Sequence, residues 1–172
     1  MLPAERCSYV LGNPPFVGSK MMNDTQRAEI KAVADGVQNS GTLDYVAAWY
    51  LLAADYARGS EIGCALVSTN SITQGEQPGI LWSRLLSRGI KISFAHRTFS
   101  WSNEARGVAA VHCVIIGFGY KEPARRTIFE YEDIRGEPHA VAAKYINPYL
   151  VDAPDVTLLL CAGDRHRQQA DR

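Results

Sequence analysis

The chain has 172 residues, enough for one domain with a sizeable core and too few for two full ones. Its 18 basic residues balance 18 acidic ones, and 47% of all residues are hydrophobic, which is ordinary for a globular domain. A self-sufficient DNA binder usually carries a basic face, so with zero net charge we expect any DNA-binding surface to be either local or mostly elsewhere, and we favour the second. No apolar run approaches the about 20 residues of a membrane span, and the start lacks a signal-peptide pattern, so we expect a cytoplasmic protein that does not enter a membrane.

Apolar runs and turn-forming residues divide the chain into strands and helices. Strands are predicted at 7–11, 62–67, 90–97 and 108–118, with a further candidate at 127–131. Helices are predicted at 24–34, 43–54 and 81–86, from capping residues and from apolar residues that recur every three or four positions. The run at 62–67 is apolar throughout, which is typical of an inner strand of a parallel sheet covered on both faces.

The order of these elements predicts an α/β fold with right-handed crossovers between parallel strands. The strands at 90–97 and 108–118 are separated by a predicted loop at 98–107. A loop of about ten residues is too short for a helical crossover. We therefore expect an antiparallel hairpin at the end of the parallel sheet.

The tetrapeptide Asn13-Pro14-Pro15-Phe16 follows the first predicted strand. Open α/β sheets bind ligands beyond the carboxyl ends of their strands. The two prolines have a fixed φ and no N–H, so they make a stiff loop with exposed carbonyl groups, and the Asn13 side chain adds an acceptor oxygen. Two acceptors one residue apart can take both hydrogens of an exocyclic NH₂ group, and the Phe16 ring can stack on the base.

Holding both hydrogens activates a poor nucleophile. The lone pair of the adenine amine is delocalised into the ring. Drawing its N–H bonds towards the Asn13 oxygen and the Pro14 carbonyl favours a tetrahedral nitrogen, whose lone pair can point at an electrophilic methyl group. The amine is inaccessible inside a duplex, so the base must be flipped out. This chemistry needs no cysteine nucleophile and no metal, and the cysteines show no metal-ligand spacing.

The tetrapeptide resembles the motif of S-adenosylmethionine-dependent methyltransferases that modify amino groups. Further segments, in order, look like the methyltransferase region of MmeI-type enzymes. Those are large bacterial restriction–modification proteins that methylate adenine at N6 and cleave DNA in one polypeptide. These segments are 43–50, 68–77, 94–99, 101–105 and 146–152, within a resemblance that covers about residues 6–158.

The resemblance implies a partial Rossmann-like methyltransferase sheet, S-adenosyl-L-methionine as cofactor and double-stranded DNA as partner. It implies the catalytic second half of the methyltransferase domain at 1–120 and a connector towards a target-recognition domain at 121–158. The prolines and the lost periodicity predict that this connector is irregular, and the polar end of the chain predicts a disordered tail at 159–172. Family members hold the cofactor with a Gly-rich loop that has no counterpart here. The cofactor-binding residues are therefore unassigned, and we expect the isolated chain to bind the cofactor weakly.

Two pairs of residues are further candidates for contacts with the flipped base. Phe99 and Trp101 fall in the predicted hairpin loop, where the family uses an aromatic ring against the base; a hydrophobic plug is the alternative. Ser68 and Asn70 end the inner strand on the side of Asn13, where they contact substrate or only cap a turn.

A small basic cluster, Lys121, Arg125 and Arg126, is a candidate for DNA-phosphate contacts or a solvated charged patch. Two other functions stay open. Methyltransferases of a protein glutamine or of a ribosomal RNA guanine use a similar tetrapeptide, because these substrates also present a planar NH₂. A non-catalytic remnant or interaction module would agree with the zero net charge. An exposed strand edge would favour self-association or a second chain that completes the sheet.

Overall fold

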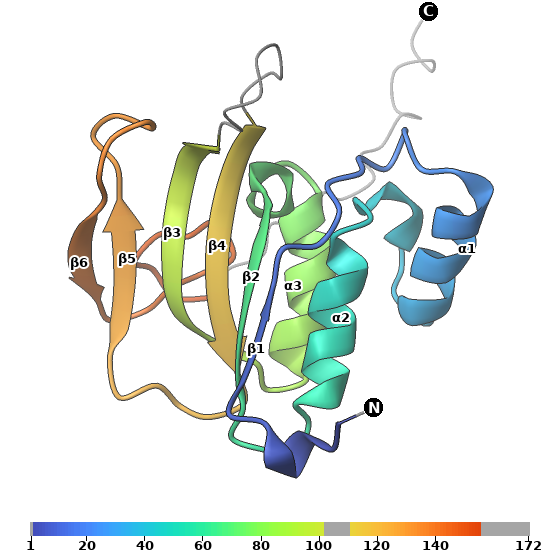
Figure 1. Cartoon of the computed structure of the whole chain (residues 1–172), viewed down its shortest axis with the longest axis horizontal. Helices are drawn as coiled ribbons and strands as arrows, with labels where there is room; N and C mark the ends of the chain where they lie inside the picture. Colours follow the sequence, from blue (N-terminus) through green and yellow to red (C-terminus); the bar gives the residue numbers. More distant parts are fainter. Residues whose placement is uncertain (1, 102–110, 156–172) are drawn as a thin grey trace, which may run out of the picture.

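A computed structural model of the chain describes residues 2–101 and 111–155 (Figure 1). They form a six-stranded mixed sheet in the order β1-β2-β4-β3-β5-β6. The strands are β1 (Tyr9–Gly12), β2 (Gly63–Thr69), β3 (Lys91–Trp101), β4 (Val111–Gly119), β5 (Arg126–Glu130) and β6 (His139–Ala143). The helices are α1 (Asp24–Val33), α2 (Ala47–Tyr56) and α3 (Gln77–Ser87), with short 3-10 turns η1 (Ala4–Arg6), η2 (Ser40–Thr42) and η3 (Asn70–Thr73). The predicted α/β class is confirmed.

The predicted antiparallel hairpin is confirmed, and its second strand lies inside the sheet. β1 pairs with β2 in parallel, and β4 runs antiparallel between β2 and β3. β3 therefore points the same way as β1 and β2, although β4 separates it from them. The carboxyl ends of β1, β2 and β3 consequently meet at one edge of the sheet, at the top of Figure 1.

The helices form largely where the sequence predicts them. α1 begins with a capping box, in which Asn23 and Gln26 each accept the other's backbone N–H. α3 begins four residues before its predicted start. α2 begins at Ala47, four residues after the predicted start, because residues 40–42 form the turn η2 instead. Leu43 and Val46 are buried but precede the helix, so apolar spacing alone misplaced its beginning.

The core lies between the sheet and the two helices α2 and α3, which share one of its faces (Figure 1). At its centre the Tyr50 ring stacks on Phe118, with centroids 5.3 Å apart, and the edge of Trp82 meets both rings. Burial along β2 alternates strictly, with Cys64 and Leu66 buried and their neighbours half-buried. The prediction that this strand is covered on both faces is therefore wrong within the described residues.

The segment at 121–158, predicted to be irregular, carries β5 and β6 in its described part, so the sheet continues beyond residue 120. β5 corresponds to the candidate strand at 127–131. β6 escaped detection because four of its five residues are exposed and show no apolar alternation. That this segment leads towards a target-recognition domain stays a prediction, and the tail at 159–172 lies outside the described residues.

β1 is an edge strand, because it pairs with β2 alone. Its outward side chains Tyr9 and Leu11 are 73% and 74% exposed, which is high for large apolar residues at a strand. No helix among residues 2–101 and 111–155 is long and apolar enough to cross a membrane.

Candidate functional site

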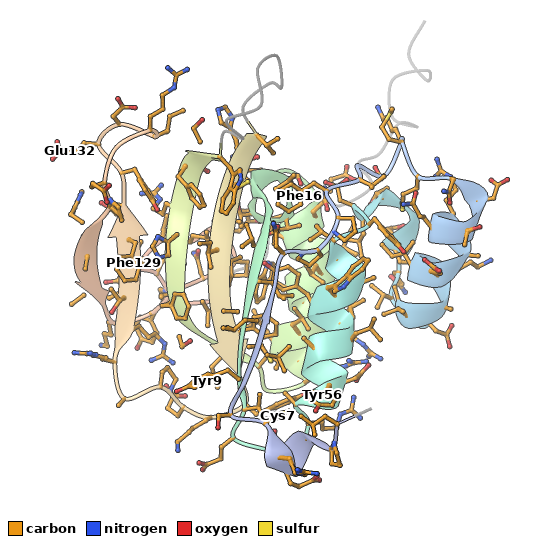
Figure 2. The ribbon with its side chains drawn as sticks, in the orientation of Figure 1. Cys7, Tyr9, Phe16, Tyr56, Phe129 and Glu132 are labelled. Atoms are coloured by element: carbon orange, nitrogen blue, oxygen red, sulfur yellow. The ribbon has the colours of Figure 1, made fainter. Side chains whose placement is uncertain are left out.

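The residues Asn13-Pro14-Pro15-Phe16 follow directly on β1, at the edge where the parallel strands end (Figure 2). Asn13 and Pro15 are exposed, Pro14 is buried and Phe16 is half-buried. This alternation fastens the loop through Pro14 and leaves the Asn13 side chain at the surface. Because each proline fixes φ near −65°, the loop has little freedom to change the spacing of its acceptors.

The two acceptors expected from the sequence are uncommitted. Among the described residues, no donor makes a hydrogen bond to the Asn13 side chain or to the Pro14 carbonyl. Asn13 is exposed, so water satisfies its side chain in the free chain and a ligand can replace that water. Asn13 and Pro14 therefore offer two adjacent acceptors to a ligand that carries two hydrogens on one nitrogen.

A groove of about 660 Å³ runs along β1 beside Asn13. Leu11 and Leu52 contribute to its apolar wall, and Asp55 is a charged residue of its lining. The Asp55 carboxylate is already paired with Arg58 at 2.5 Å and with Arg88 at 2.9 Å. The described part of the groove thus offers no unpaired charge for the amino-acid end of S-adenosylmethionine. The pair of acceptors at Asn13 and Pro14 fits a methyl acceptor.

Ser68 and Asn70 lie near the end of β2 but differ in their surroundings. Ser68 is fully buried, and its hydroxyl is 3.0 Å from that of Tyr50 in the core. It faces α2 instead of the sheet edge, so its hydroxyl does not reach a ligand there. Asn70 is half-buried and begins η3, and its carbonyl accepts the Thr73 hydroxyl at 2.8 Å. A substrate contact of Asn70 stays a prediction.

Phe99 and Trp101 lie within β3, so their predicted place in the hairpin loop is wrong. β3 continues to Trp101 because it pairs with β4 up to Val111; residues 102–110 are outside the described part of the chain. Phe99 and Thr69 both pair with Cys113, so the three residues form a row across β3, β4 and β2. With β1 three inter-strand spacings away from β3, the row ends about 14 Å from the Asn13 strand.

Phe99 belongs to an aromatic cluster that sequence reasoning missed. Its ring stacks on Tyr131, with centroids 5.4 Å apart, and His96 stacks on Phe129 at 4.2 Å. The His96 Nδ1 atom is 2.8 Å from the Tyr131 hydroxyl, and partial burial lowers the pKa of the imidazole. Two rings from β3 thus pack against two rings from the β5 region. These pairs are more than 30 residues apart in the chain, so no local sequence pattern indicates them.

Cys113 sits between Thr69 and Phe99 in the same row, which raises the question of covalent catalysis. It is fully buried, and burial raises the pKa of its thiol to about 11. A thiol with that pKa stays protonated near neutral pH and does not act as a nucleophile.

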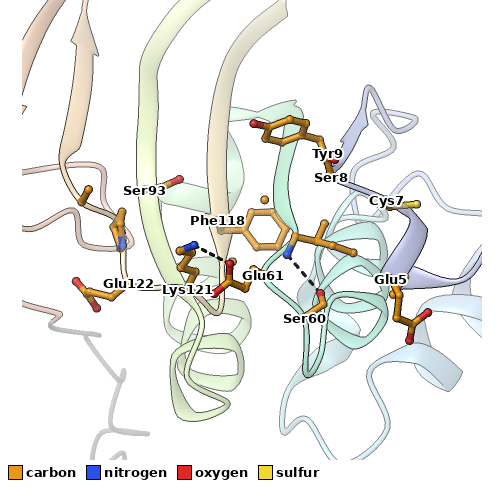
Figure 3. Close-up of a pocket in the computed structure, with 16 residues that line it drawn as sticks. Glu5, Cys7, Ser8, Tyr9, Ser60, Glu61, Ser93, Phe118, Lys121 and Glu122 are labelled. Carbon is orange, nitrogen blue, oxygen red and sulfur yellow. Dashed lines mark hydrogen bonds and ion pairs between the residues drawn. The ribbon is translucent and has the colours of Figure 1, made fainter.

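The basic cluster lies at the opposite end of the sheet from Asn13, because β4 runs antiparallel and Lys121 follows its last residue. Lys121 is 2.7 Å from Glu61 in a pocket of about 570 Å³ (Figure 3). Arg126 is paired with Glu122 at 2.5 Å, and Arg125 is exposed. The structure therefore does not bring these cations to the tetrapeptide, and their contact with DNA stays a prediction.

Comparisons with known proteins agree with this geometry. The model of the family "MmeI, DNA-methyltransferase domain" matches residues 2–130. The chain is 40% identical over 148 residues to DNA methyltransferase A of Bacillus subtilis (strain 168), which covers 86% of this chain and 16% of that protein. It is 58% identical, with a TM-score of 0.87, to the type IIL restriction–modification enzyme MmeI, solved in complex with DNA; the match covers 90% of this chain and 21% of MmeI.

The chain thus spans about a fifth or less of the length of these two relatives. The family match covers three quarters of the chain, includes the tetrapeptide and all strands of the sheet except β6, and agrees with the structural similarity to MmeI. We conclude that this chain belongs to the family of MmeI DNA-methyltransferase domains.

Proposed function

We propose that this chain forms the adenine-holding part of an S-adenosylmethionine-dependent DNA methyltransferase that modifies the N6 amine. The observation that carries the proposal is the pair of uncommitted acceptors, the Asn13 side-chain oxygen and the Pro14 carbonyl, at the carboxyl edge of the parallel strands. The family supports methyl transfer to DNA, and an exocyclic amine is the DNA group that presents two hydrogens on one nitrogen.

In this mechanism Asn13 and Pro14 each accept one hydrogen of the adenine amine. The two bonds draw the N–H groups out of the plane of the base, so the nitrogen becomes tetrahedral and its lone pair is no longer shared with the ring. S-adenosylmethionine, when bound, supplies the electrophilic methyl group. A nitrogen that gains a methyl group is positively charged and must lose one proton; the oxygens of Asn13 and Pro14 accept hydrogen bonds but are too weakly basic to keep it, so the proton passes to water. Preorganised acceptors of this kind stabilise the positive charge that develops on the nitrogen.

The aromatic residues supply surfaces for a base that has left the duplex. Phe16 is half-buried, three residues after the acceptor Asn13, so its ring is positioned by the same stiff loop. Phe99 and Trp101 end β3 towards the same edge of the sheet, and the axes of β1 and β3 are about 14 Å apart, with β2 and β4 between them. Stacking on such rings contributes about 1–3 kcal/mol per base. We propose Phe16 as the first surface and the Phe99–Trp101 pair as the second.

Duplex DNA is the proposed partner, since MmeI was solved in complex with DNA. Lys121, Arg125 and Arg126 stay candidates for phosphate contacts, although they lie at the opposite end of the sheet. Weak cofactor binding by the isolated chain, a second chain or self-association at β1, and a cytoplasmic location also stay predictions.

The proposal is tested by expressing the protein from its own gene in a bacterial host that lacks DNA adenine methylation. Genomic DNA is digested to nucleosides, and N6-methyladenine and N4-methylcytosine are quantified by mass spectrometry. We expect N6-methyladenine with the wild type and a loss of about a hundredfold or more with Asn13→Ala, the scale seen when one preorganised hydrogen-bonding group is removed from an active site. Asn23→Ala, which removes an amide from the α1 cap, is the matched control and keeps the methylation.

Each alternative gives a different result. N4-methylcytosine as the product would keep the mechanism and change the base. Methylated glutamine in protein digests or methylguanine in ribosomal RNA, with unmodified DNA, would replace the substrate class. Equal methylation by the wild type and Asn13→Ala would refute the role of the acceptor pair.

A further inference from the structure

A single carboxylate connects the loop that follows the tetrapeptide to the turn that follows β2. Asp44 lies between η2 and α2 and is half-buried. Its Oδ1 atom accepts the backbone N–H of Ser19 at 2.8 Å, and its Oδ2 atom accepts the Ser71 hydroxyl at 2.6 Å. The Ser71 hydroxyl is also 2.8 Å from that of Thr69, the last residue of β2. Asp44 therefore joins two segments that both end at the methyl-acceptor edge.

Backbone contacts fix Asp44 itself. The Tyr45 N–H donates to the Val17 carbonyl at 2.9 Å, next to the bond between Asp44 and Ser19. The Asp44 N–H donates to the Gln77 side-chain oxygen at 3.0 Å, and Gln77 begins α3. Because residues 44 and 45 are held on both sides, the carboxylate has a defined direction before it receives the Ser19 amide. Hydrogen bonds to an ionised carboxylate are also among the stronger ones in proteins.

The geometry points to Asp44 as a positioning residue for the acceptor pair. β1 fixes the loop before Asn13, and Asp44 fixes it at Ser19, so both ends of the segment 13–19 are anchored. Between the anchors, the Tyr45 N–H holds the Val17 carbonyl and the prolines fix φ at residues 14 and 15, so few backbone torsions between Asn13 and Ser19 are unrestrained. Among the described residues, Asp44 makes no hydrogen bond to Asn13 or Phe16, so it acts on them through the loop. This inference rests on the proposed function of Asn13 and Pro14.

The control must separate positioning from ordinary loop fastening. Asp152 does the same local chemistry elsewhere: its Oδ1 atom accepts the backbone N–H groups of Lys144 and Tyr145, at 3.1 and 2.8 Å. Asp44→Ala and Asp152→Ala each remove a carboxylate that holds backbone amides. Only the amide held by Asp44, that of Ser19, belongs to the segment that follows the tetrapeptide. A loss of stability alone would be similar in both variants.

The test compares ¹H–¹⁵N spectra and amide hydrogen exchange of the full chain with its Asp44→Ala, Asp44→Asn and Asp152→Ala variants. In Asp44→Ala we expect the exchange of the Ser19 amide to become about ten- to a hundredfold faster, the factor expected for a hydrogen bond to a charged group. We also expect the side-chain NH₂ signals of Asn13 and the amide signal of Phe16 to shift or broaden. Asp44→Asn keeps an acceptor for Ser19, so these signals stay close to those of the wild type. Asp152→Ala leaves them unchanged.

The decisive outcome concerns Asn13 and Phe16. If Asp44→Ala speeds exchange at Ser19 but leaves the Asn13 and Phe16 signals unchanged, Asp44 fastens Ser19 alone and the inference is overturned. If Asp44→Ala does not fold, Ser71→Ala removes one arm of the same carboxylate and must give smaller changes in the same direction. The spectra need no methyl transfer, so a failure here differs from a failure of the proposed function, in which Asn13→Ala would leave DNA methylation unchanged.

Discussion

Gly117 of β4 lies directly under the ring of Phe94 on β3, and this contact gives a quantitative prediction. A Cβ atom added at Gly117 would lie 2.1 Å from Cε1 and 2.3 Å from Cδ1 of Phe94, where ordinary contacts begin at 3.4 Å. Gly117→Ala therefore forces the ring to move by about 1 Å or more. Overpacking of this kind costs about 1–3 kcal/mol. Because Phe94 is half-buried and can swing towards solvent, we expect the lower part of that range, about 1–2 kcal/mol.

For a chain of this size each kcal/mol shifts the midpoint of thermal unfolding by about 2–4 °C, so we expect Gly117→Ala to lower Tm by about 2–8 °C. Circular dichroism of the chain measures this. Gly41→Ala is the matched control, since its added Cβ has no neighbour within 4 Å, and its Tm stays within about 1 °C of the wild type. In a Phe94→Ala background the cost of Gly117→Ala must largely disappear. An unchanged Tm for Gly117→Ala, or an undiminished cost without the ring, would refute the reasoning.

Two further predictions concern stability. Asn23→Ala removes the α1 capping box and should cost about 1 kcal/mol in urea unfolding, whereas Thr25→Ala, at an exposed site inside the helix, should cost little; equal effects would contradict the role of the cap. Burial lowers the pKa of His96 in the folded state below its ordinary value of about 6.5. As the pH falls below that value, the unfolded chain takes up a proton before the folded chain does. The folded state therefore loses stability until the pH reaches the lower pKa of the folded state. Tm measured from pH 7.5 to 5.5 should therefore fall more for the wild type than for His96→Phe, and parallel curves would exclude this contribution.

The sequence predicts local features well where one residue type has one physical role. The strand that ends at the tetrapeptide, the capped helix α1 and the hairpin of β3 and β4 were predicted from caps, prolines and loop length, and the structure confirms them. The resemblance to MmeI-type methyltransferases, drawn from the tetrapeptide and from the further segments in their order, is also confirmed by the family match. The function of Asn13 and Pro14 stays a prediction.

Features that depend on distant neighbours were not predictable from local patterns. β3 has irregularities in its pairing at 92–94 and 96–99, so Phe94, His96 and Phe99 come into ring contact on one face without simple alternation. The predicted loop at 98–107 therefore begins where β3 still continues. From its position at the end of a strand, Ser68 is predicted to lie at the sheet edge. Its actual partner, the Tyr50 hydroxyl, belongs to an earlier helix, and no local pattern around Ser68 reveals that contact. The role of Asp44 is likewise not visible in a local pattern, since its partners Ser19 and Ser71 lie far before and after it in the chain.

The position of β4 between β2 and β3 also determines when the domain can fold during synthesis. Cys64 pairs with Phe118, so β2 cannot pair with β4 until more than fifty further residues have left the ribosome. Until then, Tyr50 and Trp82 lack the third ring of their cluster, and β3 has no inner neighbour. Pairings of such long sequence separation form slowly, because the loop must close before any contact compensates its entropy. We therefore expect nascent chains that end before Gly119 to remain sensitive to proteases, and the sheet and its core to form together once β4 has emerged.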